Sequence, residues 1–386
     1  MAHSTIVGGS SAARVMACPA SVQLSERVPP QPMSSYAAEG TALHSCMEVL
    51  MTDPDATLEQ FIDVKIEGVN ITADLVDEML TPALDATNDA FRRFDVDEYE
   101  AEAVVHFRTI PGAFGTCDIA AMGRDDLLVL LDYKFGRGVM VSPVDNKQLM
   151  FYAAAMLQDP EFADWVTGSV DQPIAVGIIQ PSAEHTLQTW MTTAGEVTRF
   201  AFELSMAVTV SQKPDPGEFK LGDHCRWCPG AAICPAKNET AANILDNADS
   251  MTLAEAKAMA DEIEPWLKQV NQQVHDQLTS GGKVEGYKLT RGRMSNRTWE
   301  SPDEVIDMLR PKKKLLKADY LDTKLKSPAQ VEKLCKAKGV DFKKLTDYLK
   351  EQTQGVIVVP ESDPREGVII NAEREIPENL AKLMQA

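Results

Sequence analysis

The sequence lacks any long hydrophobic run, and this absence sets its first limits. No stretch approaches the roughly 20 apolar residues that a membrane-spanning helix needs, and Met1–Ser11 has neither the basic nor the apolar part of a signal peptide. We therefore expect a cytoplasmic protein with no membrane partner. With 386 residues and 44% hydrophobic content, the chain can build one large domain or two ordinary ones.

A disulfide framework, an internal repeat and a low-complexity tract are also missing. The seven cysteines are an odd number, and their spacing is unlike that of a secreted disulfide scaffold. In a reducing compartment they are better interpreted as metal ligands and core residues. The sequence contains no G-x-x-x-x-G-K-[ST] phosphate loop, which excludes a helicase of that type.

Net positive charge is missing as well. The formal net charge is -20, whereas phosphate binding is driven by Lys and Arg. The charge is uneven, because Lys288–Lys350 holds 17 Lys and Arg against 9 Asp and Glu. This basic segment is either a solvated helical surface or a DNA-binding surface, and composition alone favours neither. Its candidate DNA-binding residues are Arg291, Arg293 and Arg297.

The hydrophobic pattern predicts a mixed sheet flanked by helices, followed by a helical region. The helices of the first part are expected at 35–50, 73–93, 144–157 and 197–210. The strands are expected at 101–108, 115–122, 126–134, 174–180 and 187–192, the first three as an antiparallel meander.

A breaker-rich linker at 213–217 precedes a small loop that carries several cysteines. Beyond it the sequence predicts a helix at 253–278, a hairpin at 287–299 and a Lys-rich helical region to about 350, and we expect about the last 30 residues to be poorly ordered. The predicted division is a domain at 1–240 and a helical, locally basic region with a flexible tail at 241–386.

Asp132, Tyr133 and Lys134 end a strongly apolar predicted strand. The period of two places the Asp132 and Lys134 side chains on one face. If the chain turns near Asp125, residues whose numbers sum to about 250 oppose each other, which places Asp118 across from Asp132. Two such carboxylates imply Mg²⁺ or Mn²⁺ between them, and with the lysine they suit phosphodiester hydrolysis. Alone, D-x-K is more often a strand-end salt bridge.

Three further residues become informative only in combination. Gln148 and Tyr152 are four residues apart on a predicted helix, so they share a face, and both can hydrogen-bond a phosphate or a base. His44 stands in the helix predicted at 35–50. Each of them alone fits an ordinary amphipathic position or a partly buried histidine.

The ordered series of His44, Gly115–Asp118, Asp132–Lys134 and Gln148–Tyr152 resembles the motifs of the RecB-type PD-(D/E)XK nucleases over about residues 35–195. The resemblance implies a restriction-endonuclease-like α/β core. It also implies the following roles: His44, Asp118, Asp132 and the Tyr133 carbonyl as metal ligands, and Asp118, Asp132, Lys134, Gln148 and Tyr152 as catalytic residues. Cys117 departs from the proline that the family has before the first aspartate. Glu102 is a candidate for a further carboxylate behind the ligands.

A cysteine cluster follows these motifs. Cys225, Cys228 and Cys234 have C-x2-C-x5-C spacing, and a fourth ligand is either His224, for zinc, or Cys18, the stronger candidate. One cysteine before the motifs and three after them resemble the iron-sulfur staple of AddB-type helicase-nucleases and of CRISPR adaptation nucleases. This resemblance implies a 4Fe-4S cluster, with zinc as the alternative because spacing does not separate the two.

Ser10–Ser21, Gly286–Lys288 and Ser295–Trp299 are similar to a phage and prophage family known mainly as a domain of unknown function. The similarity implies a stand-alone metal-dependent exonuclease that processes DNA ends in phage recombination, replication or repair, in the host cytoplasm if a phage encodes it. It implies DNA as a partner, and a single-strand annealing or binding protein as a second one. Two alternatives stay open: a catalytically weak DNA-binding or replication-partner scaffold on the same fold, and a zinc-stabilised protein-interaction module.

Overall fold

A computed structural model describes residues 6–29, 35–137, 139–246, 252–294, 297, 299, 301–311, 316–320, 325–349 and 354–368. The chain divides into two compact units, Met1–Val270 and Asn271–Ala386. Within these described ranges, no helix is both long and apolar enough to cross a membrane.

The first unit is built around a five-stranded sheet with the order β3-β4-β5-β6-β7. Its strands are β3 Glu98–Phe107, β4 Ala113–Gly123, β5 Leu127–Tyr133, β6 Pro173–Ile179 and β7 Leu187–Thr193. Only β5 and β6 pair in parallel, and the other neighbours are antiparallel. The predicted mixed sheet and its meander are therefore confirmed. A second, two-stranded sheet consists of β1 Val64–Ile66 and β2 Val69–Ile71.

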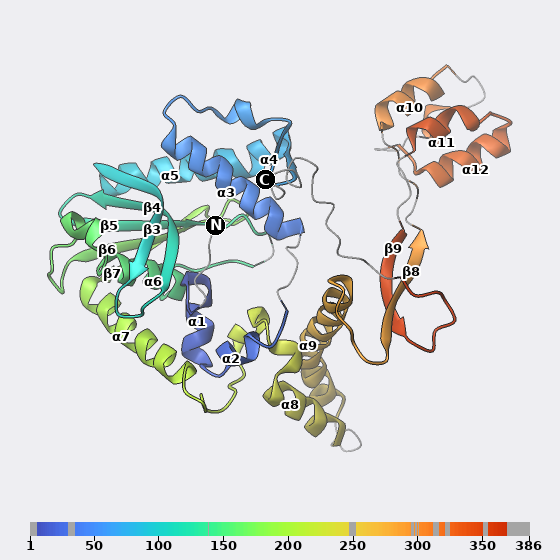
Figure 1. The fold of residues 1–386 in the computed structure, drawn as a ribbon. Helices are drawn as coiled ribbons and strands as arrows, with labels where there is room; N and C mark the ends of the chain where they lie inside the picture. Colours follow the sequence, from blue (N-terminus) through green and yellow to red (C-terminus); the bar gives the residue numbers. More distant parts are fainter. Residues whose placement is uncertain are drawn as a thin grey trace, which may run out of the picture. The chain divides into compact units, whose positions relative to one another are not determined.

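Helices cover both faces of the large sheet (Figure 1). One layer contains α1 Gly9–Ala17, α6 Lys147–Met156 and α7 Ala194–Ser211, and the other contains α3 Ser35–Thr52, the π-helix η2 Val76–Leu80 and α5 Thr81–Phe94. Because strand side chains alternate, Leu128 and Leu130 face the first layer while Val129 and Leu131 face the second. The other helices described in this unit are α8 Pro235–Asp246 and the short α2 Ser21–Ser25, η1 Leu58–Phe61, α4 Ala73–Leu75, η3 Pro160–Trp165, η4 Asp223–Trp227 and η5 Ala231–Ile233.

The helix α9 Leu253–Thr279 begins in the first unit and ends in the second. The second unit pairs β8 Tyr287–Met294 with β9 Gln354–Pro360 in an antiparallel ladder. Its helices are α10 Pro302–Leu309, α11 Lys317–Tyr320, α12 Pro328–Lys338 and η7 Lys343–Tyr348, which enclose a small core around Trp299, Val305 and Leu345.

Two expectations for this unit need correction. The hairpin predicted at 287–299 is wrong, because β8 takes its partner strand from Gln354–Pro360 rather than from the residues that follow it. The first residues of the predicted flexible tail, up to Pro360, belong to β9, where ladder hydrogen bonds fix the backbone. Residues 361–368 are also described. The rest of that tail, 369–386, lies outside the described residues.

Candidate metal centre

Three acidic residues form one row across the neighbouring strands β3, β4 and β5. The ladder pairs Ala101 with Ile119, and it pairs Ile119 with Leu131 on the other side. The next positions along these strands are Glu102, Asp118 and Asp132. The register predicted from the turn near Asp125 is therefore confirmed, and it also places Glu102 level with the aspartates.

The backbone is irregular at this row. Glu102 has a φ of 52°, in the left-handed region that side chains other than glycine rarely adopt. Ala101 packs toward the α3 layer and Ala103 toward the α6 layer, although residues two apart in a regular strand share a face. On β4, Cys117 and Ile119 are divided in the same way. Such strain costs about 1–3 kcal/mol and is typical of functional sites.

His44 reaches the row from α3 and completes a group that can hold a cation. Its Nδ1 atom lies 3.2 Å from Asp118 Oδ1, and one ligand atom each of His44, Glu102 and Asp118 lie within 4.8 Å of one another. The imidazole ring packs edge-on against Phe135 with a centroid distance of 5.3 Å. Its buried Nδ1 has no hydrogen-bond partner of good geometry, which leaves it available as a ligand.

The electrostatics of this group favour a bound cation. Burial, followed by the charge of Asp118, raises the pKa of Glu102 to about 7. Burial also raises the pKa of Asp132, against the opposing effect of Lys134. Burial acts to lower the pKa of His44, but the charge of Asp118 and contact with it outweigh that effect, and the pKa of His44 lies above its ordinary value. Burial and mutual repulsion disfavour the ionised form of clustered carboxylates, and a bound divalent cation offsets that repulsion.

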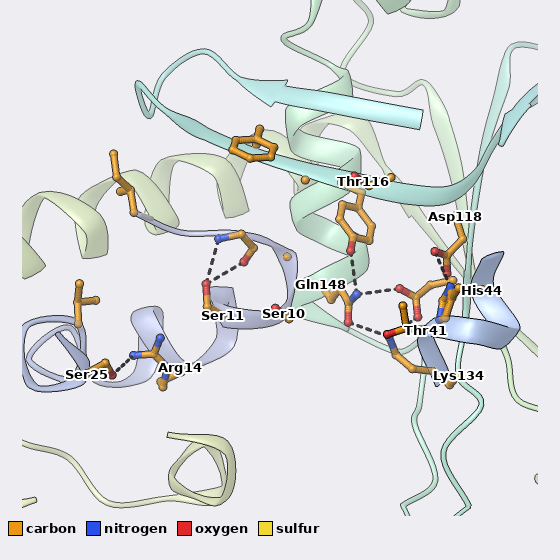
Figure 2. Close-up of a pocket in the computed structure, with 18 of the residues that line it drawn as sticks. Ser10, Ser11, Arg14, Ser25, Thr41, His44, Thr116, Asp118, Lys134 and Gln148 are labelled. Atoms are coloured by element: carbon orange, nitrogen blue, oxygen red, sulfur yellow. Dashed lines mark hydrogen bonds and ion pairs between the residues drawn. The ribbon is translucent and has the colours of Figure 1, made fainter. Parts of the chain in front are cut away.

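A second, connected set of side chains lies beside the first. The Lys134 ammonium lies 2.5 Å from Asp132 Oδ2 and donates to Gln148 Oε1 at 3.0 Å. The Gln148 amide in turn donates to Asp132 Oδ1 and to the Tyr152 hydroxyl, both at 2.8 Å. Figure 2 shows this chain of contacts. Residues from β5, the segment after it and α6 thus hold one another in place.

Tyr133 contributes its backbone to the site rather than its ring. Its amide donates to Asp118 Oδ2 at 2.6 Å, while its hydroxyl makes a 2.9 Å hydrogen bond with Thr87 in the opposite layer. The alternation of strand side chains produces this division. Both oxygens of Asp118 are therefore engaged, one by Tyr133 and the other by His44.

Apart from Glu102, which is not part of its lining, the residues of the two sets line a cavity of about 580 Å³, and α1 and α2 border this cavity on its other side. Arg14 lines it from α1, and its guanidinium donates to Ser21 Oγ at 2.9 Å. Gly115 allows Tyr152 to pack closely, because a Cβ atom at position 115 would lie 2.9 Å from the tyrosine ring. The helix Gly9–Ala17 was not among the helices predicted from the sequence. Its Ser-Ser-Ala-Ala-Arg segment is the local pattern that could have predicted it.

The structure brings the four cysteine segments into one neighbourhood. The backbone of Lys220 connects two of them, since its amide lies 3.4 Å from Cys18 Sγ and its carbonyl 3.8 Å from Cys225 Sγ. Burial raises the pKa of Cys228, and the charges of Cys225 and Cys234 add to this effect while Arg14 opposes it.

These cysteines do not form a closed ligand set, and the expected iron-sulfur cluster is not seen. Across the described ranges, His44, Glu102 and Asp118 are the one group of three or more potential ligands within 4.8 Å of one another. A single zinc ion would hold its thiolates about 3.8 Å apart. Thiols do not attract one another unless they share a metal. The cysteines here contact neighbouring groups instead, and Cys18, for example, accepts a hydrogen bond from the Lys220 amide.

The three arginines predicted to bind DNA belong to the second unit, and they are not equivalent. Arg291 is exposed on β8. Arg297 forms an ion pair with Glu332 and lies 5.8 Å from the centre of the Phe342 ring, so it stabilises its own unit. The side chain of Arg293 lies outside the described residues.

Comparison with known proteins gives a distant structural likeness and a family. A solved structure described as the crystal structure of SSO0001 is 15% identical, covers 58% of this chain and 84% of that chain, and superposes with a TM-score of 0.25. A likeness of that size does not establish a shared fold. Residues 3–366 match the family described as "Protein of unknown function (DUF2800)". The chain therefore belongs to the DUF2800 family.

Proposed function

We propose that this protein is a metal-dependent deoxyribonuclease that hydrolyses phosphodiester bonds, and that it acts as an exonuclease on DNA ends. The observation that carries the proposal is the convergence of His44, Asp118, Asp132 and Lys134 on one cavity. A Glu102 carboxylate oxygen lies within 4.8 Å of the ligand atoms of His44 and Asp118. A purely structural role does not require three carboxylates to crowd together beside a buried imidazole.

His44, Glu102 and Asp118 fit a hard divalent cation such as Mg²⁺ or Mn²⁺, with Asp132 beside them. A cation held there lowers the pKa of a bound water and neutralises charge on a phosphate. Lys134, fixed by Asp132 and Gln148, is placed to stabilise negative charge that develops on the phosphate. Gln148 and Tyr152 keep this lysine and Asp132 in position.

The proposal is tested by digesting end-labelled linear DNA and covalently closed circular DNA with Mg²⁺ or Mn²⁺. We expect the wild type to degrade the linear substrate and spare the circle. We expect Asp132→Ala and Lys134→Ala to abolish degradation, while Lys147→Ala, which removes a half-buried lysine paired with Asp145, leaves it intact. Cleavage of the circle would show internal cutting and contradict the exonuclease assignment.

A scaffold that binds DNA or a replication partner is the second candidate, and of these two partners the acidic net charge of -20 favours the protein. It predicts binding of DNA without hydrolysis under either metal. DNA and a single-strand annealing or binding protein are the partners that we propose. Co-purification of such a protein together with inactivity of the wild type would replace the nuclease proposal by the scaffold.

Gly115→Ala provides a test of positioning at this site. The added Cβ would displace the buried Tyr152 ring and, through Gln148, shift Asp132. We expect hydrolysis to fall about 10- to 100-fold with little loss of thermal stability. Gly136→Ala is the matched control, because its Cβ would meet nothing within 4 Å. Equal rates for the two variants would contradict a positioning role for Tyr152.

We also propose that Cys18, Cys225, Cys228 and Cys234 hold a 4Fe-4S cluster, with zinc as the alternative. The support is that segments about 200 residues apart meet at Lys220 and Arg14. Metal binding by distant residues stabilises the folded chain. For Cys228→Ala we expect loss of bound metal and a Tm lower by about 5–15 °C, whereas Cys46→Ala, in the α3 layer, keeps the metal. Iron and sulfide analysis after anaerobic purification separates the cluster from zinc, and a metal-free wild type would refute both.

A further inference from the structure

A second cavity, of about 980 Å³, lies on the cysteine-bearing loop and the start of α9. Two tryptophans line it, Trp227 from η4 and Trp266 from α9. Trp227 is 73% exposed, which is unusual for so large an apolar side chain. The Arg226 guanidinium lies 5.2 Å from the centre of the Trp227 indole ring. An exposed indole with a cationic neighbour in a cavity is an arrangement that stacks planar aromatic ligands.

The wall of this cavity is held rigidly and carries unpaired polar atoms. Gln269 Nε2 donates to the carbonyl of Arg226 at 3.0 Å and to that of Cys225 at 3.3 Å, which fixes the loop. The Gln269 Oε1 and Trp266 Nε1 atoms are buried without a hydrogen-bond partner. One is an acceptor and the other a donor, and because both are buried, a nucleobase edge reaches them only if the cavity wall shifts.

The charges in the cavity favour a base over an isolated phosphate. Arg226 and Lys237 supply two cations, while Asp223 and Asp261 supply two carboxylates, of which Asp261 is paired with Lys257. The local balance is therefore close to neutral. Binding there must depend mainly on stacking and base-edge hydrogen bonds, with Arg226 and Lys237 assisting the backbone of a strand.

We propose that this cavity, lined by Trp227 and Trp266, binds single-stranded DNA by stacking a base on Trp227, and this assignment rests on the proposed nuclease function. The helix α1 connects the two sites: its first residues line the metal cavity, and its C-cap residue Cys18 contacts Lys220 beside the cysteine loop. Nine residues of helix span roughly 14 Å. A few nucleotides of a single strand cover that distance, so one strand can occupy both the stacking site and the metal centre.

The test is fluorescence anisotropy with a labelled oligothymidine of roughly 10 nucleotides, measured on the full chain with Ca²⁺ in place of Mg²⁺ or Mn²⁺ so that binding is read without hydrolysis. Trp227→Ala should weaken binding about 5- to 100-fold, and Trp227→Phe should restore most of it. Phe202→Ala is the matched control, because Phe202 is an aromatic residue that is 66% exposed on α7 and lines neither cavity. A duplex of the same length should bind more weakly, with no dependence on Trp227.

Unchanged binding by Trp227→Ala, or an equal loss for the duplex, would overturn the single-strand assignment. Failure of the wild type to bind the oligonucleotide would do the same. A wild type that binds in a Trp227-dependent manner but never hydrolyses DNA would support the stacking site and refute the nuclease. Hydrolysis together with Trp227-independent binding would refute the stacking site alone.

Discussion

Asp118→Asn should lower DNA hydrolysis by roughly a thousandfold or more while leaving the protein folded. The carboxamide keeps an oxygen that accepts the Tyr133 amide hydrogen, so the internal hydrogen bond at this position survives. It removes the charge that faces His44 and Glu102, and with it one of the cation's ligands. The rate on linear DNA and the affinity for Mn²⁺ by calorimetry should fall together.

Without metal, the same variant should have nearly the stability of the wild type, because two effects oppose each other. Asp118 contributes to raising the pKa of Glu102, so its charge opposes the ionisation of that neighbour, and loss of the charge relieves this repulsion. The substitution also removes the attraction of Asp118 to His44 and Lys134, so thermal unfolding in the presence of a chelator should show a Tm close to that of the wild type. Asp126→Asn is the control, because it makes the same change at the exposed turn of the same hairpin, where Asn tolerates the φ of 60°. Wild-type hydrolysis by Asp118→Asn would remove this carboxylate from the metal centre.

The relation between Asp118 and Asp132 could be predicted because a short turn fixes the register of a hairpin. Few residues separate β4 from β5, so the pairing of Ile119 with Leu131 follows once the turn is placed near Asp125. The polar positions of α6 were accessible for a similar reason. A spacing of four on a helix brings Gln148 and Tyr152 together, and they share a hydrogen bond.

Glu102 was underestimated because its role depends on a local backbone conformation that the sequence does not reveal. In a regular β3 strand, Ala101 and Ala103 would share one face of the sheet and Glu102 would point to the other face. In the structure, those two alanines pack into different layers. The left-handed φ at Glu102 produces the change. Opposed residues of the β3–β4 hairpin have a constant sum of residue numbers, as they do in the β4–β5 hairpin. The same reasoning that placed Asp118 opposite Asp132 could therefore have placed Glu102 opposite Asp118.

The error at β8 has a different cause. Tyr287–Met294 has the alternation of a strand, but its partner begins only at Gln354, after the helices α10, α11, α12 and η7. Local patterns report that a segment is extended and do not report which distant segment pairs with it. The N-terminal helix α1 was missed for a related reason, since its place against α6 and α7 is a tertiary fact.

Glu102→Gln should remove the pH dependence that this carboxylate gives to stability. The pKa of Glu102 is about 7 in the folded protein, raised by burial and by Asp118 from an ordinary value of 4.5. Between these two values the folded state binds more protons than the unfolded state, so the wild type loses stability as pH rises through this window. The glutamine variant lacks that loss. In chelator, its free energy of unfolding should exceed that of the wild type by on the order of 1–2 kcal/mol above about pH 7, after allowance for solvent screening, and the difference should vanish toward about pH 4.5.

With Mn²⁺ present, the sign of the comparison changes. The cation requires the ionised carboxylate, so binding to the wild type releases a proton below about pH 7 and strengthens as pH rises toward that value. We expect the metal to raise the Tm of the wild type more than that of Glu102→Gln, with the largest gap at neutral pH. His44 also has a raised pKa, and its contribution to stability is lost at higher pH, above its ordinary value of 6.5. Because both proteins retain His44, its effect is expected to cancel in the difference, and parallel pH profiles with and without Mn²⁺ would exclude Glu102 as a ligand.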